Sequence, residues 1–73
     1  MAIVEIKAEI TGNVWKIVAA VGDQVEEDQE VLILESMKME IPVAASEGGR
    51  VTEILVSEGQ TITEGTVVAR IEV

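Results

Sequence analysis

The chain repeats itself once, and this repeat limits the folds that its 73 residues can adopt. A shift of 37 residues aligns the first half with the second without a gap, so that Gly12 falls on Gly49 and Gly22 on Gly59. Apolar positions between these glycines match as well. Two repeats are too few for a solenoid, which needs about three to bury its faces. The repeat therefore predicts a closed, two-fold sandwich in which each half covers the other.

β-Branched residues dominate the chain, with 12 Val, 9 Ile and 5 Thr against 3 Leu. Their side chains are stiff at χ1 and favour pleated sheet over helix. We therefore expect an all-β domain with four strands in each half. The expected strands cover residues 2–8, 13–20, 24–26, 30–36, 39–44, 50–57, 61–63 and 66–73. Pro42 lacks an N–H, so we expect it on a sheet edge or near a strand end.

Composition excludes several classes of function. The chain has no Cys and no His, which excludes disulfides, zinc sites of the usual kind and Cys or His nucleophiles. Its net charge of −9 predicts a surface that repels nucleic acid and anionic lipid. The longest apolar run, residues 17–21, is too short to cross a bilayer. The first ten residues alternate and do not resemble a signal peptide, so we expect a cytoplasmic protein.

The midpoint of the chain, Met37-Lys38, has an unusual sequence for a turn. In a two-fold arrangement the midpoint lies at one pole and the termini meet at the other. Two-residue hairpin turns favour Asn-Gly or Asp-Gly, because both central residues need positive φ. A local rule broken at an exposed tip suggests function. The ordinary alternative is a solvated lysine beside methionines that fill the core.

The residues around this midpoint resemble the attachment motif of biotinyl domains. Residues 35–40, ESMKME, contain the Met-Lys-Met centre preceded by Ser. Residues 12–16, GNVWK, are similar to the Gly-x-Val-Trp segment of that family, and residues 21–25, VGDQV, to its Gly-Asp-x-Val turn. The resemblance covers nearly the whole chain. Residues 1–73 are thus identified as one domain of the biotinyl/lipoyl attachment family.

The resemblance implies a fold and a function. The fold is a flattened β-barrel of two four-stranded antiparallel sheets, with Lys38 at a hairpin tip. A biotin protein ligase joins biotin to the Lys38 amine through an amide. The biotin is then carboxylated by a biotin carboxylase and gives up its carboxyl group to a carboxyltransferase, which we expect to be of the acyl-CoA type, such as acetyl-CoA carboxylase. The domain is thus a carrier subunit without a catalytic site of its own.

The residues beside the lysine receive roles from the same resemblance. Met37 and Met39 are expected to be recognised by the ligase, with a place for Met39 in the core as the alternative. Ser36, Glu35 and Glu40 complete the motif with weaker roles. The two glutamates steer docking or keep the edge soluble, and we slightly favour solubility.

Trp15 stands where the other half has Thr52. We prefer a place for its indole at one open end of the core, with a partner contact as the alternative.

The sequence departs from the family in two places. Prolines common near the first bend are absent from residues 8–11, and a glycine of the first polar loop is replaced by Asp28, whereas Gly65 keeps it in the second half. Asp tolerates left-handed geometry. Some bacterial carriers have an inserted thumb, for which the gapless repeat leaves no segment. We therefore expect a small, free-standing monomer, and Met1 suggests a complete reading frame.

Two other functions remain open. A lipoyl domain would display a lysine on the same fold, although such domains usually have Asp-Lys-Ala at the tip, and modification by both biotin and lipoate is a further alternative. The second function that remains open is that of an unmodified adaptor, which binds partners through its acidic surface or its strand edges.

Overall fold

The computed structural model describes residues 2–73 and contains eight β-strands and no helix in that range. The strands are β1 (Ile3–Lys7), β2 (Gly12–Ile17), β3 (Gln24–Val25), β4 (Glu30–Ser36), β5 (Met39–Ala44), β6 (Gly49–Ile54), β7 (Thr61–Ile62) and β8 (Val67–Glu72). All eight expected strands are present, and the all-β prediction is confirmed. No membrane-spanning helix is found among these residues.

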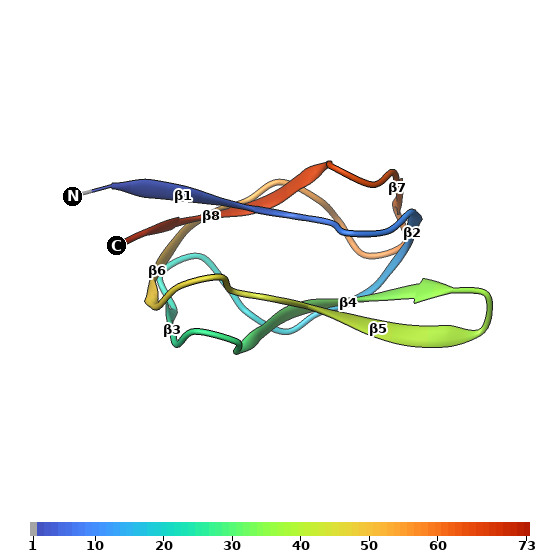
Figure 1. Cartoon of the computed structure of the whole chain (residues 1–73), viewed down its shortest axis with the longest axis horizontal. Coiled ribbons are helices and arrows are strands. Elements are labelled where there is room, and N and C mark those ends of the chain that lie inside the picture. The colour runs from blue at the N-terminus through green and yellow to red at the C-terminus, as the bar shows by residue number, and fades with distance from the viewer. Residues whose placement is uncertain (1) are drawn as a thin grey trace.

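The strands form two four-stranded sheets that pack face to face (Figure 1). One sheet has the order β1-β8-β6-β3 and the other β5-β4-β2-β7, with antiparallel pairing throughout. A shift of 37 residues carries β1, β2, β3 and β4 onto β5, β6, β7 and β8. The repeat therefore converts one sheet into the other, and each sheet contains two strands from each half.

Aliphatic side chains alone make up the buried core between the sheets. No polar or charged residue among residues 2–73 is buried. The largest fully buried side chains are Leu32, Leu34, Ile71, Val14, Val25, Val31, Val51 and Val68. Close packing of these branched side chains holds the sandwich together without a disulfide.

Trp15 lies outside this core, so the expectation that its indole closes one end of the core was wrong. Its side chain is 43% exposed and does not belong to the core cluster. The register between β2 and β4 shifts between Val14 and Lys16, and the register between β6 and β8 shifts at the equivalent place around Thr52. Trp15 therefore occupies a β-bulge next to buried Val14, where its ring meets solvent and the Lys16 ammonium, 5.6 Å from the ring centre.

The first polar loop keeps its turn although it lacks the glycine. Asp28 has a φ of 68°, and Gly65, its equivalent, has a φ of 89°. The backbone N–H of Asp28 donates to the carbonyl of Ala45, and that of Gly65 donates to the carbonyl of Ala8. Asp28 thus adopts the left-handed conformation that its short polar side chain tolerates.

The first bend is held by hydrogen bonds in the absence of proline. The N–H of Ala8 donates to the carbonyl of Thr66 at 2.9 Å, and the N–H of Glu64 donates to Oγ1 of Thr11 at 3.1 Å. These contacts tie residues 8–11 to the loop before β8. Pro42 lies in β5, which is an edge strand as expected.

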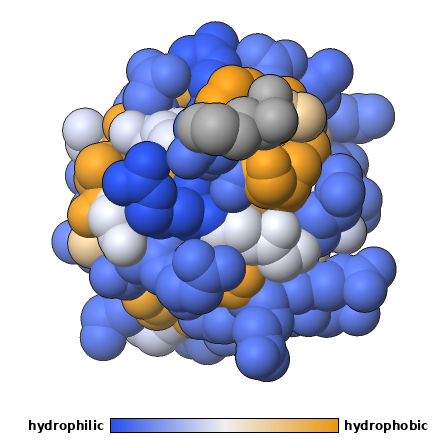
Figure 2. Space-filling model, turned by 90° about the vertical axis from the view of Figure 1, so that its left-hand side faces the viewer, coloured by the Kyte–Doolittle hydropathy of each residue, from blue (hydrophilic) through white to orange (hydrophobic). Residues whose placement is uncertain are grey.

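The two ends of the chain meet at the pole opposite the β4–β5 hairpin (Figure 1). Ala2 and Val73 exchange two backbone hydrogen bonds there. Seen from this pole, the surface is mostly hydrophilic with separate apolar patches (Figure 2). The arrangement leaves the chain midpoint alone at the far end, as the two-fold repeat predicts.

Candidate functional site

The hairpin between β4 and β5 ends in a two-residue turn formed by Met37 and Lys38. Ser36 pairs with Met39 across the ladder, so only these two residues connect the strands. Met37 has a φ of 52° and Lys38 a φ of 64°. Positive φ at both central residues is typical of the type I′ turn that suits twisted antiparallel strands. A residue with a β-carbon is about 1–2 kcal/mol less stable in this conformation, so the turn keeps two strained residues at its tip.

The base of the hairpin is fixed by the core. β4 lies between β5 and β2 in its sheet. Leu32 and Leu34 on β4 are fully buried, and Val43 on β5 is 7% exposed. The hairpin then extends past the other strands (Figure 1). Buried side chains at its base thus hold the tip in one orientation, whereas the tip itself projects into solvent.

The side chains at the tip are all exposed. Lys38 is exposed, Met37 is 92% exposed and Met39 is 62% exposed. The interpretation of Met39 as a core residue is therefore wrong. Met39 has the same strand parity as half-buried Ile41 and buried Val43, but its exposure places it outside the core cluster.

The amine of Lys38 is available for chemistry. The three ion pairs found within residues 2–73 are formed by Arg50 and Arg70, and no hydrogen bond from Lys38 is found in that range. A primary amine that is exposed and has no carboxylate in contact can be acylated without breaking an existing interaction. The geometry therefore fits covalent attachment of a carboxylic acid to Nζ.

Two carboxylates face each other just behind the tip. Glu35 and Glu40 are direct partners in the β4–β5 ladder, and both are exposed. Like charges directly opposite each other destabilise a hairpin. Ser36, between Glu35 and the turn, is half-buried. The tip therefore combines one amine and two thioethers with an acidic band behind them, and residues 2–73 contain no group of side chains arranged to hold a metal ion.

Comparison with known proteins agrees with this geometry. A family model described as "Biotin-requiring enzyme", of the biotin/lipoyl type, matches residues 2–71. The chain belongs to the biotin/lipoyl family. The family match covers both sheets and the hairpin, so the resemblance inferred from residues 35–40 extends to the complete fold.

Two relatives in this biotin/lipoyl family cover most of the chain. A biotin/lipoyl attachment protein of Bacillus subtilis is 48% identical over 62 residues, which are 85% of this chain and 85% of that protein. A protein of Mycobacterium leprae named "Biotinylated protein TB7.3 homolog" is 42% identical over 65 residues, which are 89% of this chain and 92% of that protein.

A solved structure shows the same biotin/lipoyl fold within a large enzyme. The urea carboxylase of Kluyveromyces lactis matches 99% of this chain with a TM-score of 0.93 and 42% sequence identity. The match covers only 6% of the urea carboxylase chain. It confirms the all-β flattened sandwich that the sequence predicts.

Proposed function

We propose that this domain is a biotin carboxyl carrier and that biotin is attached to Nζ of Lys38. The observation that carries the proposal is the position of Lys38, which is exposed and unpaired at a hairpin tip whose base is locked into the core. The match to a biotin-requiring family supports biotin as the group. Because the carrier delivers its cargo to two active sites, we assign the chemistry to partner enzymes and none to this chain.

The chain contributes an amine and a rigid support for it. In the attachment step, Nζ forms an amide bond with the biotin carboxyl carbon of biotinyl-adenylate, and AMP leaves. A lysine ammonium must first lose a proton, and no general base from residues 2–73 contacts Lys38, so the ligase has to accept that proton. A preorganised tip lowers the ordering cost when the ligase binds.

Met37 and Met39 give the ligase an apolar surface on both sides of the amine. Both thioethers are exposed and unbranched, so they can adapt to a pocket on the ligase. Glu35 and Glu40 place two negative charges behind them, and we propose that these charges attract a basic rim around the ligase site. Their direct opposition lowers hairpin stability, so a docking role explains the pair better than solubility alone.

Biotin supplies a ureido nitrogen that accepts and releases a carboxyl group. The carrier brings the tethered biotin to separate active sites. A tether on a rigid tip replaces free diffusion by an effective concentration in the millimolar range. We propose that the domain works as a cytoplasmic monomer with biotin carboxylase and carboxyltransferase subunits of an acyl-CoA carboxylase. Since urea carboxylase contains a similar domain, the transferase, and not the carrier fold, selects the acceptor.

Lipoate is the second candidate group for Lys38. The relative from Bacillus subtilis has a name that includes both biotin and lipoyl attachment, and it is 48% identical to this chain. The exposed methionines on both sides of the lysine favour biotin over lipoate here.

Labelling with a purified biotin protein ligase, ATP and biotin tests the site. The unmodified chain is expected to gain one biotin, and Lys38→Arg is expected to fold normally and gain none. Lys7→Arg and Lys16→Arg are matched controls that should label as the original chain does. Loss of labelling in either control, with labelling kept in Lys38→Arg, would overturn the assignment.

A further inference from the structure

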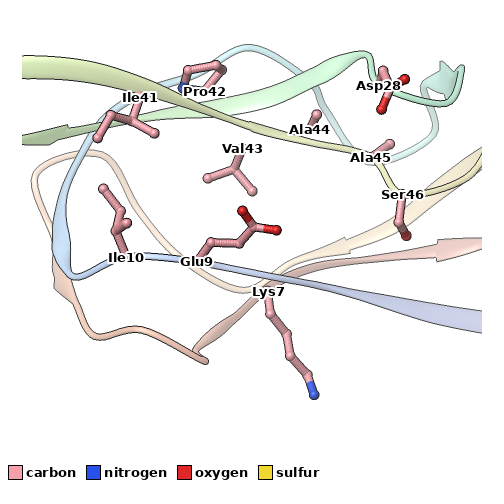
Figure 3. Close-up of a pocket in the computed structure, with 10 residues that line it drawn as sticks. All are labelled: Lys7, Glu9, Ile10, Asp28, Ile41, Pro42, Val43, Ala44, Ala45 and Ser46. Carbon is pink, nitrogen blue, oxygen red and sulfur yellow. The ribbon is translucent and has the colours of Figure 1, made fainter.

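A groove of about 290 Å³ runs along the seam between the two sheets, where the edge strands β1 and β5 lie near each other. Its walls come from Lys7, Glu9 and Ile10 on one side and residues 41–46 on the other, with Asp28 at one end (Figure 3). This volume is near the lower end of small-molecule sites, which begin at about 300 Å³. The groove is therefore large enough for a small bicyclic ring system.

The groove differs between its two ends. Ile10 and Ile41 line it at the end nearer the hairpin, and they point toward each other in Figure 3. The two-fold repeat places Glu47 and Val4 at the equivalent positions at the other end of the seam, and neither of them lines the groove. The repeat alone would make both ends alike. The apolar pair is therefore specific to the end that faces the Lys38 side.

One polar side chain enters the apolar part of the groove. The carboxylate of Glu9 points into it toward Val43, whereas the side chain of Lys7 points away (Figure 3). Glu9 forms no ion pair or side-chain hydrogen bond with another residue of the 2–73 range. Its oxygens are therefore free to accept hydrogen bonds from a ligand that offers N–H groups beside an apolar body.

The groove lies within reach of the tip. Ile41 follows Lys38 by three residues along the strand, a distance of about 10 Å at roughly 3.4 Å per residue. A lysine side chain and a five-carbon acyl chain together contain about eleven bonds, which extend for roughly 14 Å because bonds of ~1.5 Å advance by about 1.25 Å each along a zigzag chain. A ring at the end of that tether can fold back along β5 and arrive between Ile10 and Ile41. Because the tether makes this encounter intramolecular, even weak contacts suffice.

We propose that this groove is a resting site for the biotin ring tethered to Lys38. The inference deepens the proposed function and rests on it. Ile10 and Ile41 contact the sulfur-containing ring and the end of the acyl chain, and the Glu9 carboxylate accepts a hydrogen bond from a ureido N–H. The ring leaves the groove when a partner active site binds it more tightly. The resting site thus limits exposure of an apolar ring in the free carrier.

Methyl NMR on the unlabelled and ligase-labelled protein tests the resting site. Labelling is expected to shift the Ile10 and Ile41 methyl signals and to give NOEs from biotin ring protons to both. Ile10→Glu introduces the residue that the repeat has at position 47, and because Ile10 is half-buried against the core, circular dichroism first verifies that the variant is folded. In that variant the labelling-induced shift of Ile41 is expected to fall severalfold, and the NOEs should disappear. Glu47→Ala, at the other end of the seam, is the matched control and should change neither.

The outcomes separate this inference from the proposed function. Complete labelling at Lys38, verified by peptide mass, with shifts confined to residues 36–40 would overturn the resting site and leave the carrier function intact. Absence of labelling at Lys38 would overturn both. Glu9→Gln keeps one acceptor oxygen and should retain the NOEs, whereas Glu9→Ala should weaken them. Equal NOEs in all the variants would contradict the proposed contacts.

Discussion

Gly12 lies directly against the backbone carbonyl of Glu35, two residues before the turn of the lysine hairpin. A β-carbon on Gly12 would lie 2.8 Å from that oxygen. The repeat gives the same relationship a second time, because a β-carbon on Gly49 would lie 2.5 Å from the carbonyl oxygen of Glu72. Both obstacles are backbone atoms of a paired strand, which cannot rotate away. Close approach of the strands, rather than backbone conformation, thus explains glycine at both positions.

Alanine at either glycine is therefore expected to destabilise the domain. Overpacking of this kind costs about 1–3 kcal/mol. Gly12→Ala and Gly49→Ala should each lower the free energy of unfolding by that amount in urea denaturation followed by circular dichroism. Gly48→Ala is the matched control, since its β-carbon would have no neighbour nearer than 3.5 Å. A loss in Gly48→Ala equal to that in Gly49→Ala would contradict the steric explanation.

Because the turn at the tip is strained, we expect a substitution there to raise the stability of the domain and to slow recognition by the ligase. Met37→Gly relieves a positive-φ residue and should stabilise the domain by about 0.5–1 kcal/mol after the greater freedom of glycine in the unfolded chain is included. The same change removes one thioether, so the rate of ligase labelling should fall. Urea denaturation and a labelling time course measure the two effects.

Met37→Leu is the control for that experiment, because it keeps both the strain and an apolar side chain. Its stability should equal that of the original chain, and its labelling should remain near the original rate. Faster labelling of Met37→Gly than of Met37→Leu would show that the side chain at position 37 does not assist the ligase.

Most of the fold was predictable because both halves of the sequence carry the same pattern of glycine and apolar residues. The alignment of Gly12 with Gly49 and of Gly22 with Gly59 defines the register of the halves, and alternation of branched residues defines the strands. The position of Lys38 followed from the midpoint of the repeat. These inferences depend on the spacing of apolar residues and glycines along the chain, which can be read from the sequence.

Features that depend on the third dimension were not predictable in the same way. The bulge at Trp15 moves a large aromatic residue to the surface, and only the ladder between β2 and β4 reveals it. Met39 has inward parity, but the hairpin extends beyond the core that would have covered it. The groove was also missed. Its signal was the sequence of the first bend, where Glu9 and Ile10 supply two of the side chains that line one wall.

The surface position of Trp15 predicts that its removal has little effect on stability. Trp15→Thr introduces the residue that the repeat has at position 52, and it loses about 0.5–1 kcal/mol from the contact with Lys16. Leu34→Ala should lose about 2–5 kcal/mol, because Leu34 is fully buried. Both are measured by thermal denaturation followed by circular dichroism. A loss of stability in Trp15→Thr as large as that in Leu34→Ala would show that the indole packs in the core.

The pair Asp28 and Gly65 predicts which side chains the second loop accepts. Asp28 already adopts a φ of 68° at the equivalent position, so Gly65→Asp is expected to cost less than about 1 kcal/mol. Gly65→Val should cost about 1–2 kcal/mol, because a β-branched residue resists positive φ. Open space surrounds the position, so sterics with neighbours do not complicate the comparison. Equal losses in the two variants, measured in urea, would contradict this account.

The intact mass of the protein purified from its native host tests the central claim most directly. We predict a mass increase of one biotinyl group, located on Lys38 by peptide sequencing in the mass spectrometer and absent from Lys38→Arg. A chain that carries no group, a lipoyl group alone, or biotin on Lys7 or Lys16 would contradict the account.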